Sequence, residues 1–322
     1  MRTVVKVGGA RAVDPAGALA DVAQLVSEEG SGPEEVVLVH GGSTAVDDTL
    51  ERLGIEPEYV ETPSGVVGRF TDSETMEVFE MVMPGLLNTE LVASLQSLGV
   101  DAVGLSGVDG KLLHGPRKSA VRVVEDGKRK IRRGDHSGSI EAVNADLLEG
   151  LLGDGYTPVV SPPMAGGDSD EDGNDVVTPV NTDADRAAAT IAGALDAQLV
   201  LLTDVPGILA DPEDRDSLIR TVETPADWER MAEAAEGFMG RKVMAIREAL
   251  EGGAPEVVVA DANLEEPIDT ALEGDGTHVF PGAIESEGAG EGASASDSGD
   301  AGGEGNDGAT SGAAEIDGGD SQ

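Results

Sequence analysis

The chain has 322 residues, in which 63 Asp and Glu stand against 21 Lys and Arg, a formal net charge of -42 and a pI near 4.1. This charge repels a phosphate backbone and argues against a nucleic-acid binder. The chain has no Cys, which excludes disulfides, thiolate metal sites and cysteine nucleophiles. We find no apolar run near the roughly 18–20 residues of a membrane span and no signal peptide before the first strand-like run, so we expect a soluble cytoplasmic protein.

The acidity extends along the whole chain. Residues 285–322 hold 10 carboxylates and no basic or aromatic residue, which leaves 53 of the 63 for the rest of the chain. Repulsion between such charges weakens when about 1 M salt shortens the screening length to roughly 3 Å. We therefore expect a halophilic cytoplasm. The composition of residues 284–322 predicts a disordered acidic tail.

Short apolar runs alternate with longer stretches rich in Ala, Leu and Glu over residues 1–283. The runs predict strands at 4–7, 36–39, 102–105, 157–160, 198–202 and 256–259. The longer stretches predict helices at 16–28, 43–53, 73–98, 144–152, 183–195, 225–235 and 241–251. This alternation favours a three-layer αβα sandwich with a mainly parallel open sheet. Two segments interrupt it: a predicted β-hairpin at 117–140 around Asp126-Gly127, and a Gly/Asp-rich excursion at 162–179.

Two predicted strands run into glycine pairs. The first gives Lys6-Val7-Gly8-Gly9 and the second His40-Gly41-Gly42-Ser43, followed by a helix. Glycines there let backbone N–H groups approach an oxyanion closely, and the helix N-terminus adds its positive end. Lys6 is either an edge-strand lysine that reaches water or a functional cation. Its position in an apolar run of a lysine-poor chain favours the second interpretation.

Three further positions suggest polar chemistry. Asn181, Asp183 and Asp185 open an Ala-rich helix, and two Asp with an Asn exceed what a helix cap requires. Their alternate spacing suggests oxygens directed at one centre, which orient a lysine or a hydrated Mg²⁺. The segment 201–208 is typical of a buried strand that ends in a polar turn suited to a nucleotide. Lys242 lies in the first turn of a helix, where its charge opposes the macrodipole and suggests a facing anion.

From residue 6 to about residue 280 the chain resembles the amino-acid kinases, and within them the acetylglutamate kinase branch. The motifs agree in order and spacing; they are Lys6-x-Gly8-Gly9, His40-Gly41-Gly42, Gly65 to Asp72, Asn181-x-Asp183-x-Asp185, Thr203 to Gly207 and Gly237 to Lys242. The family phosphorylates a carboxylate or a similar oxyanion with ATP. The resemblance implies that Lys6 and Lys242 stabilise the transferred phosphoryl group and that Asp185 positions them.

The same resemblance assigns the remaining site residues. It implies that Gly8 and Gly9 hold phosphate, that Gly41, Gly42, Arg69 and Asn181 bind the acyl substrate, and that Thr203, Asp204 and Gly207 bind the nucleotide. It implies Mg²⁺ bound through ATP, with no direct protein ligand. The third glycine common in the family is Ser43 here. We expect an acyl-substrate lobe at 1–178 and an ATP-binding lobe at 179–283. We also expect a homodimer, because the helix that precedes the first strand in arginine-inhibited hexamers is missing.

The predicted hairpin indicates whether the substrate is free or bound to a carrier protein. Eight of the 21 basic residues fall in residues 117–133. This cluster predicts docking of an acidic partner through Arg129, Lys130, Arg132 and Arg133. The resemblance implies a LysW-like acidic amino-group carrier protein that bears glutamate or 2-aminoadipate. A free N-acetylglutamate kinase and a nucleotide-binding regulator without transfer remain alternatives, and the choice between glutamate and 2-aminoadipate stays open.

Overall fold

The computed structural model describes residues 2–8, 14–27, 34–63, 65, 67–125, 127–170, 172–235 and 239–285. Residues 1–286 form one compact unit. Of the tail predicted at 284–322, Ile284 is described and packs against the core, whereas the residues from 286 onward lie outside the described residues, as do Gly9 and residues 236–238. The boundary between the two expected lobes stays a prediction.

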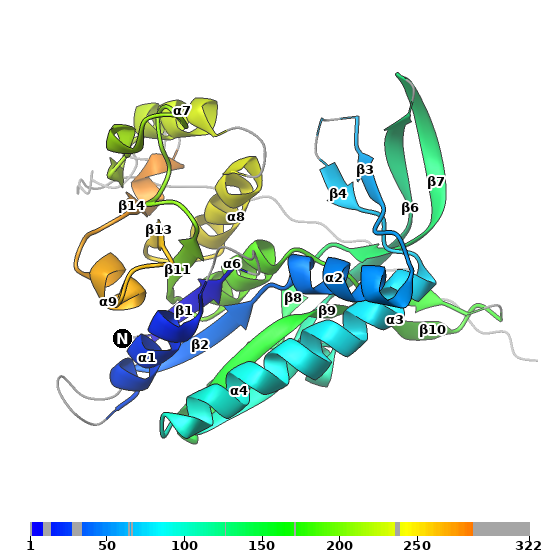
Figure 1. The fold of residues 1–322 in the computed structure, drawn as a ribbon, viewed down its shortest axis with the longest axis horizontal. Coiled ribbons are helices and arrows are strands. Elements are labelled where there is room, and N and C mark those ends of the chain that lie inside the picture. The colour runs from blue at the N-terminus through cyan, green and yellow to red at the C-terminus, as the bar shows by residue number, and fades with distance from the viewer. Residues whose placement is uncertain are drawn as a thin grey trace, which may run out of the picture. The chain divides into compact units, whose positions relative to one another are not determined.

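Twelve strands form one sheet, in the main order β12-β14-β13-β11-β1-β2-β9-β6-β7, with β5 and β10 on β9 and β8 on β6 (Figure 1). The strands of this sheet are β1 (Arg2–Val7), β2 (Glu35–His40), β5 (Ala102–Gly107), β6 (Leu113–Glu125), β7 (Lys128–Gly138), β8 (Ala142–Val143), β9 (Thr157–Ser169), β10 (Asp175–Val180), β11 (Gln198–Thr203), β12 (Thr221–Val222), β13 (Val257–Asp261) and β14 (Thr277–Val279). A separate ribbon pairs β3 (Tyr59–Glu61) with β4 (Val67–Arg69).

Strand β1 lies in the interior of the sheet. It pairs in parallel with β2 on one side and with β11 on the other, and β13 and β9 continue the parallel order outward. Antiparallel pairs occur at β13/β14, β6/β7, β6/β8 and β9/β10. The mainly parallel open sheet is therefore confirmed, and the carboxyl ends of β1, β2 and β11 share one edge, where open sheets bind ligands.

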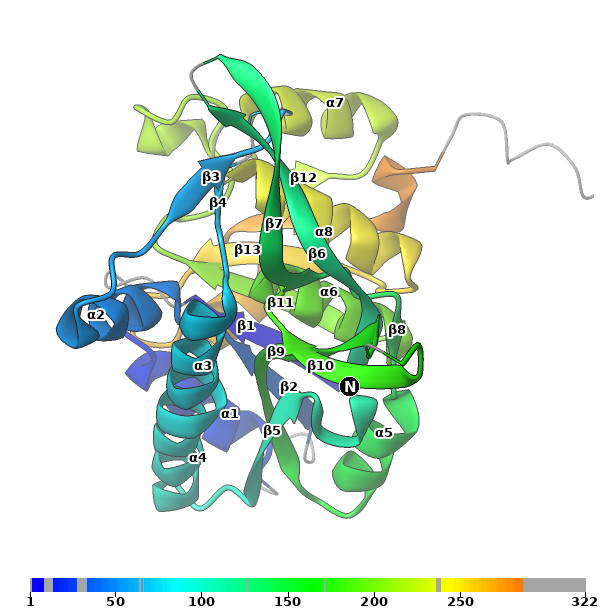
Figure 2. The same cartoon turned by 90° about the vertical axis from the view of Figure 1, so that its right-hand side faces the viewer.

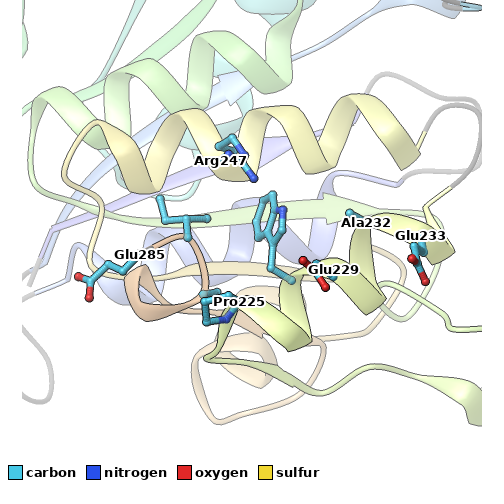
Figure 3. Close-up of a pocket in the computed structure, with 9 residues that line it drawn as sticks. Pro225, Glu229, Ala232, Glu233, Arg247 and Glu285 are labelled. Carbon is cyan, nitrogen blue, oxygen red and sulfur yellow. The ribbon is translucent and has the colours of Figure 1, made fainter. Parts of the chain in front are cut away.

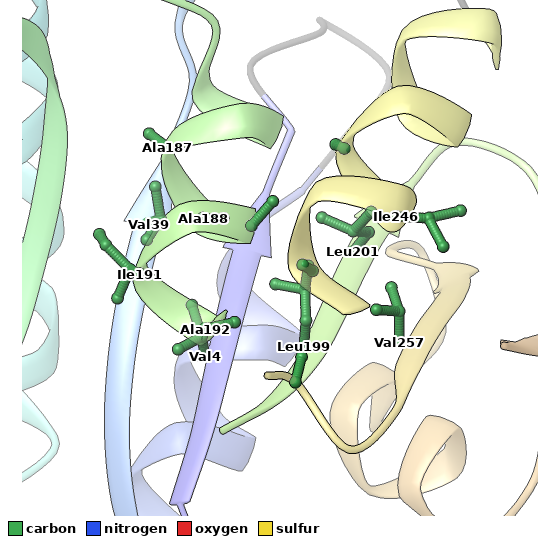
Figure 4. Packing of buried hydrophobic residues seen from close by; sticks show 14 of the residues in the cluster. Val4, Val39, Ala187, Ala188, Ile191, Ala192, Leu199, Leu201, Ile246 and Val257 are labelled. Carbon is green, nitrogen blue, oxygen red and sulfur yellow. The ribbon is translucent and has the colours of Figure 1, made fainter. Parts of the chain in front are cut away.

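Helices cover both faces of the sheet. One face packs against α1 (Ala16–Leu25), α4 (Asn88–Ser97) and α9 (Pro267–Leu272). The other packs against α5 (Ala145–Gly153), α6 (Ala184–Ala194), α7 (Pro225–Ala234) and α8 (Met239–Glu251). Alternation along a strand decides the face: Val4 joins the α6/α8 side, as Figure 4 shows, whereas Val5 and Val7 join the α1 side. This arrangement confirms the three-layer sandwich.

The long helix predicted at 73–98 is divided into three parts. It comprises α3 (Ser73–Glu80), a π-helical segment η1 (Met81–Leu87) and α4, with Pro84 inside η1. Proline has no N–H and crowds the preceding turn, so the ladder widens around it. By length and composition Ser73–Ser97 would suit a membrane span. Its buried residues, however, pack against β5, β9 and α2 (Ser43–Leu53), as in a core helix.

Two hairpins extend the sheet. The hairpin predicted at 117–140 is confirmed as β6/β7, and the hairpin stands beside β3/β4 (Figures 1 and 2). The Gly/Asp-rich excursion at 162–179 is a second antiparallel hairpin, β9/β10. It was not predicted as strands because glycine and aspartate have low strand propensity. Short 3₁₀ turns occur at η2 (Asp109–Lys111), η3 (Arg215–Ser217) and η4 (Pro281–Ala283).

Candidate active site

Lys6 is buried near the carboxyl end of β1. It shares with Val4 the face that packs against α6 and α8, and only 6% of the residue is exposed. Because β1 has paired neighbours on both sides, the interpretation of Lys6 as an edge-strand lysine that reaches water is wrong. The strand therefore delivers an ammonium group into the interface between the sheet and two helix N-termini.

Asp185 joins Lys6 to Lys242. The Lys6 Nζ lies 2.6 Å from Asp185 Oδ1, and the Lys242 Nζ donates to Asp185 Oδ2 at 3.1 Å. Asp185 is in the first turn of α6 and Lys242 in the first turn of α8. Residues from three distant segments thus form one buried cluster around Asp185, and we call its two lysines the lysine pair.

The charges in this cluster do not balance. Burial alone raises the pKa of Asp185, but Lys6 and Lys242 outweigh it and hold that pKa well below its ordinary 3.8. Burial, together with the charge of Lys6, lowers the pKa of Lys242. Two ammonium groups share one carboxylate, so an anion that approaches them would gain a strong electrostatic interaction.

The three polar residues before and in α6 have separate partners. Asp183 caps α6 by accepting from the backbone N–H groups of Asp185 and Arg186, at 2.9 and 3.2 Å. The side chain of Asn181 donates to Thr71 Oγ1 at 3.0 Å. Because α6 begins at Ala184, Asp185 lies in its first turn and contacts both lysines. A common centre for the oxygens of all three residues stays a prediction.

The glycines of the second strand form a tight turn. The N–H of Gly41 donates to Val7 O at 3.1 Å, which joins the ends of β2 and β1. A Cβ at Gly42 would lie 2.4 Å from Leu87 Cδ1 and 2.5 Å from Met83 Sδ, so a larger residue would require these side chains to move. Gly42 precedes α2 directly. Gly8 follows β1 at the same edge, whereas Gly9 lies outside the described residues.

Arg69 is held at the beginning of α2. Its guanidinium pairs with Asp47 and donates to the backbone O and the Oγ of Ser43, at 3.0 and 2.9 Å. It also lies 5.4 Å from the centroid of the Tyr59 ring. Strand β4 therefore places a cation next to the Gly41-Gly42 turn, and protein partners already use part of its hydrogen-bonding capacity.

The turn after β11 is closely packed. Thr203 Oγ1 donates to Asp204 Oδ1 at 3.2 Å. Gly207 has a φ of +151°, and a Cβ there would lie 2.6 Å from Leu218 Cδ1 and 2.7 Å from Thr277 Oγ1. Since β11 pairs in parallel with β1, this turn lies at the same edge of the sheet as Gly8.

The four residues predicted to dock a carrier divide between the two faces of the hairpin. Arg132 pairs with Glu58 and lies 4.2 Å from the centroid of the Phe70 ring, and Lys130 pairs with Glu125 at 2.7 Å. Arg129 and Arg133 are exposed, and no described residue bonds to their side chains. The structure thus separates them from Arg132, which is used within the protein.

Several buried or partly buried polar residues had no assignment from sequence. His40 and Asn88 hydrogen-bond to each other beneath the Gly41-Gly42 turn. Asp135, at the base of the hairpin, accepts from the N–H of Thr71 at 3.3 Å. Arg241 lies within 3.8 Å of Asp183 and reaches toward Gly68 of β4. His40 and Arg241 could have been found from the sequence, because each directly precedes a residue of a recognised motif, Gly41 and Lys242. Asn88 and Asp135 lie next to no such motif.

Cavities occur away from the lysine pair. One of about 770 Å³ lies between α7, α8 and η4, where the Arg247 Cζ lies 4.8 Å from the centroid of the Trp228 ring (Figure 3). A second of about 330 Å³ lies beside the β11 turn and includes Pro206 and Asp261. No group of three His, Asp or Glu suited to a metal ion occurs among the described residues.

Named relatives match most of this chain. It is 48% identical over 278 residues to a LysW-aminoadipate kinase of Deinococcus radiodurans, covering 86% of this chain and 90% of the relative. It is 42% identical over 279 residues to an acetylglutamate kinase of Methanopyrus kandleri, with 86% and 99% covered. It is 35% identical over 251 residues to a LysW-aminoadipate/LysW-glutamate kinase of Saccharolobus islandicus, with 77% and 90% covered.

A solved structure shares the fold. The carbamate kinase of Giardia superposes with a TM-score of 0.59 at 15% identity, covering 87% of this chain and 98% of that one. The family model described as the amino acid kinase family matches residues 1–261, which include the lysine pair and the glycine turns. The chain therefore belongs to the amino acid kinase family.

Proposed function

We propose that this protein transfers the γ-phosphoryl group of ATP to the side-chain carboxylate of glutamate or 2-aminoadipate, whose amino group is attached to a LysW-like carrier protein. The product is an acyl phosphate, which we propose is an intermediate of arginine or lysine biosynthesis. The observation that carries the proposal is the buried lysine pair around Asp185, at the carboxyl edge of a parallel sheet.

The reaction needs neutralisation of charge rather than covalent help. A carboxylate oxygen forms the new bond to phosphorus while the bond to the β–γ bridging oxygen breaks, and ADP leaves with that electron pair. No proton moves, because the acceptor carboxyl is ionised at neutral pH. Lys6 and Lys242 stabilise the negative charge on the transferred oxygens, and Asp185 fixes the spacing of the two ammonium groups.

The other site residues have supporting roles in this proposal. Gly8 and Gly9 approach the phosphates, and Thr203, Asp204 and Gly207 hold the nucleotide. Gly41, Gly42, Arg69 and Asn181 bind the acceptor. Asp183 and Asp185 already have protein partners, so we expect Mg²⁺ to have no direct protein ligand. It enters with ATP and adds positive charge to the phosphates.

The β6/β7 hairpin supports a carrier-bound acceptor. Register pairs Ile131 with Arg122 and Arg129 with Val124, so these side chains share one face with Arg133. Ile131 is 68% exposed in the middle of this face. An apolar residue surrounded by free arginines suits an acidic protein with an apolar contact, and we propose this outer face as the docking surface.

The base of the hairpin leads to the acceptor residues. The N–H of Asn181 donates to His136 O at 2.8 Å, and the N–H of His136 donates to Thr71 O at 2.7 Å. Thr71 follows Arg69 by two residues. A carrier on the hairpin would therefore present its attached amino acid beside the residues that we propose to bind it.

Turnover of ATP with alternative acceptors tests the function. We expect ADP release in molar KCl with carrier-linked glutamate or 2-aminoadipate at a kcat/KM at least about tenfold above that with N-acetylglutamate, a difference of about 1.4 kcal/mol. Lys242→Met should abolish it while the carrier still binds. Equal or higher efficiency with N-acetylglutamate would support the free acetylglutamate kinase suggested by the Methanopyrus relative. No ADP with any acceptor would support a nucleotide-binding regulator.

We further propose that the protein works as a homodimer in a salt-rich cytoplasm. The acyl-substrate lobe would comprise residues 1–178 and the ATP-binding lobe residues 179–283. The charge of the chain supports the salt-rich setting, because 53 carboxylates lie outside residues 285–322. Light scattering in molar KCl measures the dimer directly.

A further inference from the structure

A buried histidine lies beneath the Gly41-Gly42 turn. His40 ends β2 and is 2% exposed, and its side chain shares the face of Val36 and Leu38, which packs against α1 and α4. Its Nε2 lies 3.2 Å from Asn88 Nδ2 of α4, and its Nδ1 lies 3.0 Å from Gly41 O. This is the face opposite to the lysine pair, so His40 does not contact the phosphates that we propose to bind there.

The partners determine which nitrogen carries the proton. Asn88 Nδ2 donates to Val159 O at 2.8 Å, which identifies it as the amide nitrogen and leaves its second hydrogen for His40 Nε2. His40 Nε2 therefore accepts, and Nδ1–H donates to the Gly41 carbonyl. Burial lowers the pKa of His40 to about 4, so the neutral ring persists at neutral pH. The ring is thus a fixed donor toward Gly41.

Gly104 of strand β5 leaves room for the Asn88 side chain that bonds to His40. A Cβ at Gly104 of β5 would lie 2.1 Å from Asn88 Oδ1, so any other residue there would displace the amide. Asn88 is itself only 4% exposed. Burial of an amide and an imidazole costs free energy unless both are hydrogen-bonded, and here both are.

The hydrogen bond from His40 to Gly41 O also orients the N–H of Gly42. The peptide between Gly41 and Gly42 is planar and trans, so its carbonyl and the N–H of Gly42 point in opposite directions. Fixing the carbonyl therefore fixes the N–H. Among the residues that the structure describes, none accepts a hydrogen bond from Gly42 N–H, and α2 begins directly after it.

We infer that His40, oriented by Asn88, is a positioning residue that aims the Gly42 N–H at the reacting oxyanion. The inference rests on the proposed function of the Gly41-Gly42 turn in binding that oxyanion. A preorganised N–H stabilises charge only when it points where charge develops, and glycine lacks the side chain that would otherwise restrict the turn. His40 supplies that restriction through one hydrogen bond.

Two substitutions separate positioning from packing. In His40→Asn the side-chain amide replaces Nδ1 and still donates to Gly41 O, whereas in His40→Gln it replaces Nε2 and meets only Asn88. We expect kcat to fall about tenfold or more in His40→Gln, less than the about 100-fold loss for removing a donor outright, and to stay within about threefold in His40→Asn. The KM for ATP should change less than kcat in both.

A readout without turnover keeps the outcome separate from the proposed function. We expect the ¹⁵N–¹H resonance of Gly42 to keep its position in His40→Asn and to shift or broaden in His40→Gln, with the melting temperatures of both measured alongside. Equal losses of kcat that follow the melting temperature, or an unchanged Gly42 resonance in both variants, would overturn the inference. A wild-type protein inactive with every acceptor would refute the function, while the Gly42 resonances would still decide the role of His40.

Discussion

The buried lysine pair has an electrostatic property that a surface cluster would lack. Water hardly reaches the cluster, so each ammonium group depends on Asp185 and on whatever anion binds beside it. Asp185 is fully engaged, at 2.6 Å from Lys6 and 3.1 Å from Lys242. Burial and the positive charge of Lys6 lower the pKa of Lys242, so Lys242 loses its proton more easily than a free lysine does.

The pH dependence of activity should reveal the lowered pKa of Lys242. Because the pKa of Lys242 is lowered from its ordinary 10.5, kcat/KM should decline at high pH, as Lys242 loses its proton, before a free lysine would titrate. Bound phosphates favour the ammonium form, so the same limb in kcat should lie at higher pH. Lys242→Arg, which stays charged, should remove the limb, whereas Lys111→Arg at an exposed site should not. An alkaline limb unchanged in Lys242→Arg would contradict the assignment.

At the level of elements, the glycine turn depends on the irregular helix that packs over it. Met83 and Leu87, both in η1, occupy the space where a Gly42 side chain would lie. The turn, the π-helical segment and Pro84 thus form one packed unit, with Val46 and Leu50 of α2 beneath it.

Gly42→Ala should disturb this unit. We expect a loss of about 1–3 kcal/mol in the free energy of unfolding from overpacking, and a larger loss of kcat than stability alone explains. Gly150→Ala is the matched control, since a Cβ in that helix meets open space, and it should be neutral or stabilising by about 0.5–1 kcal/mol. Denaturant titration in molar KCl measures both. Equal stability of the two variants would show that the turn tolerates a side chain.

The hairpin offers a second test at this scale. Arg129→Ser with Arg133→Ser should raise the apparent KM for carrier-linked substrate about tenfold or more, because two exposed cations leave the outer face. The change should leave the KM for ATP unaltered. Arg220→Ser with Arg230→Ser removes the same charge from exposed positions outside the hairpin and serves as control. If the two double variants behave alike, the effect reflects net charge and not docking.

The sequence predicted the elements better than their irregularities. Apolar runs located β1, β2, β9, β11 and β13, because strands buried on both faces leave a continuous signal. It did not predict the π-helix at Pro84 or the β9/β10 hairpin, since both depend on tertiary packing that glycine and proline only permit. In the site, Lys6 and Lys242 were conspicuous as cations in unusual places. The His40–Asn88 bond was not, because it joins residues 48 positions apart.

The whole molecule combines a strong negative charge with a few placed cations. Of its 21 basic residues, eight lie in residues 117–133 and two form the lysine pair. The remaining surface carries most of the 63 carboxylates, whose repulsion opposes the compact state. Salt should therefore determine stability for the entire chain.

We expect the melting temperature to rise steeply with KCl between about 0.1 M and 1 M, where the screening length shortens from about 10 Å to about 3 Å. Sucrose, which favours burial without screening charge, should stabilise the protein much less at low salt. Scanning calorimetry at fixed pH measures both series. A melting temperature independent of KCl would contradict a halophilic adaptation.

The most direct test of the proposed function measures where the phosphoryl group goes. The protein is mixed with ATP, Mg²⁺, N-acetylglutamate and carrier-linked 2-aminoadipate or glutamate together, and hydroxylamine converts each acyl phosphate into a stable hydroxamate. Mass spectrometry then identifies the modified acceptor. We expect hydroxamate on the side chain of the carrier-linked amino acid and its loss with Lys242→Met. Hydroxamate found on N-acetylglutamate, with the carrier unmodified, would contradict the proposal.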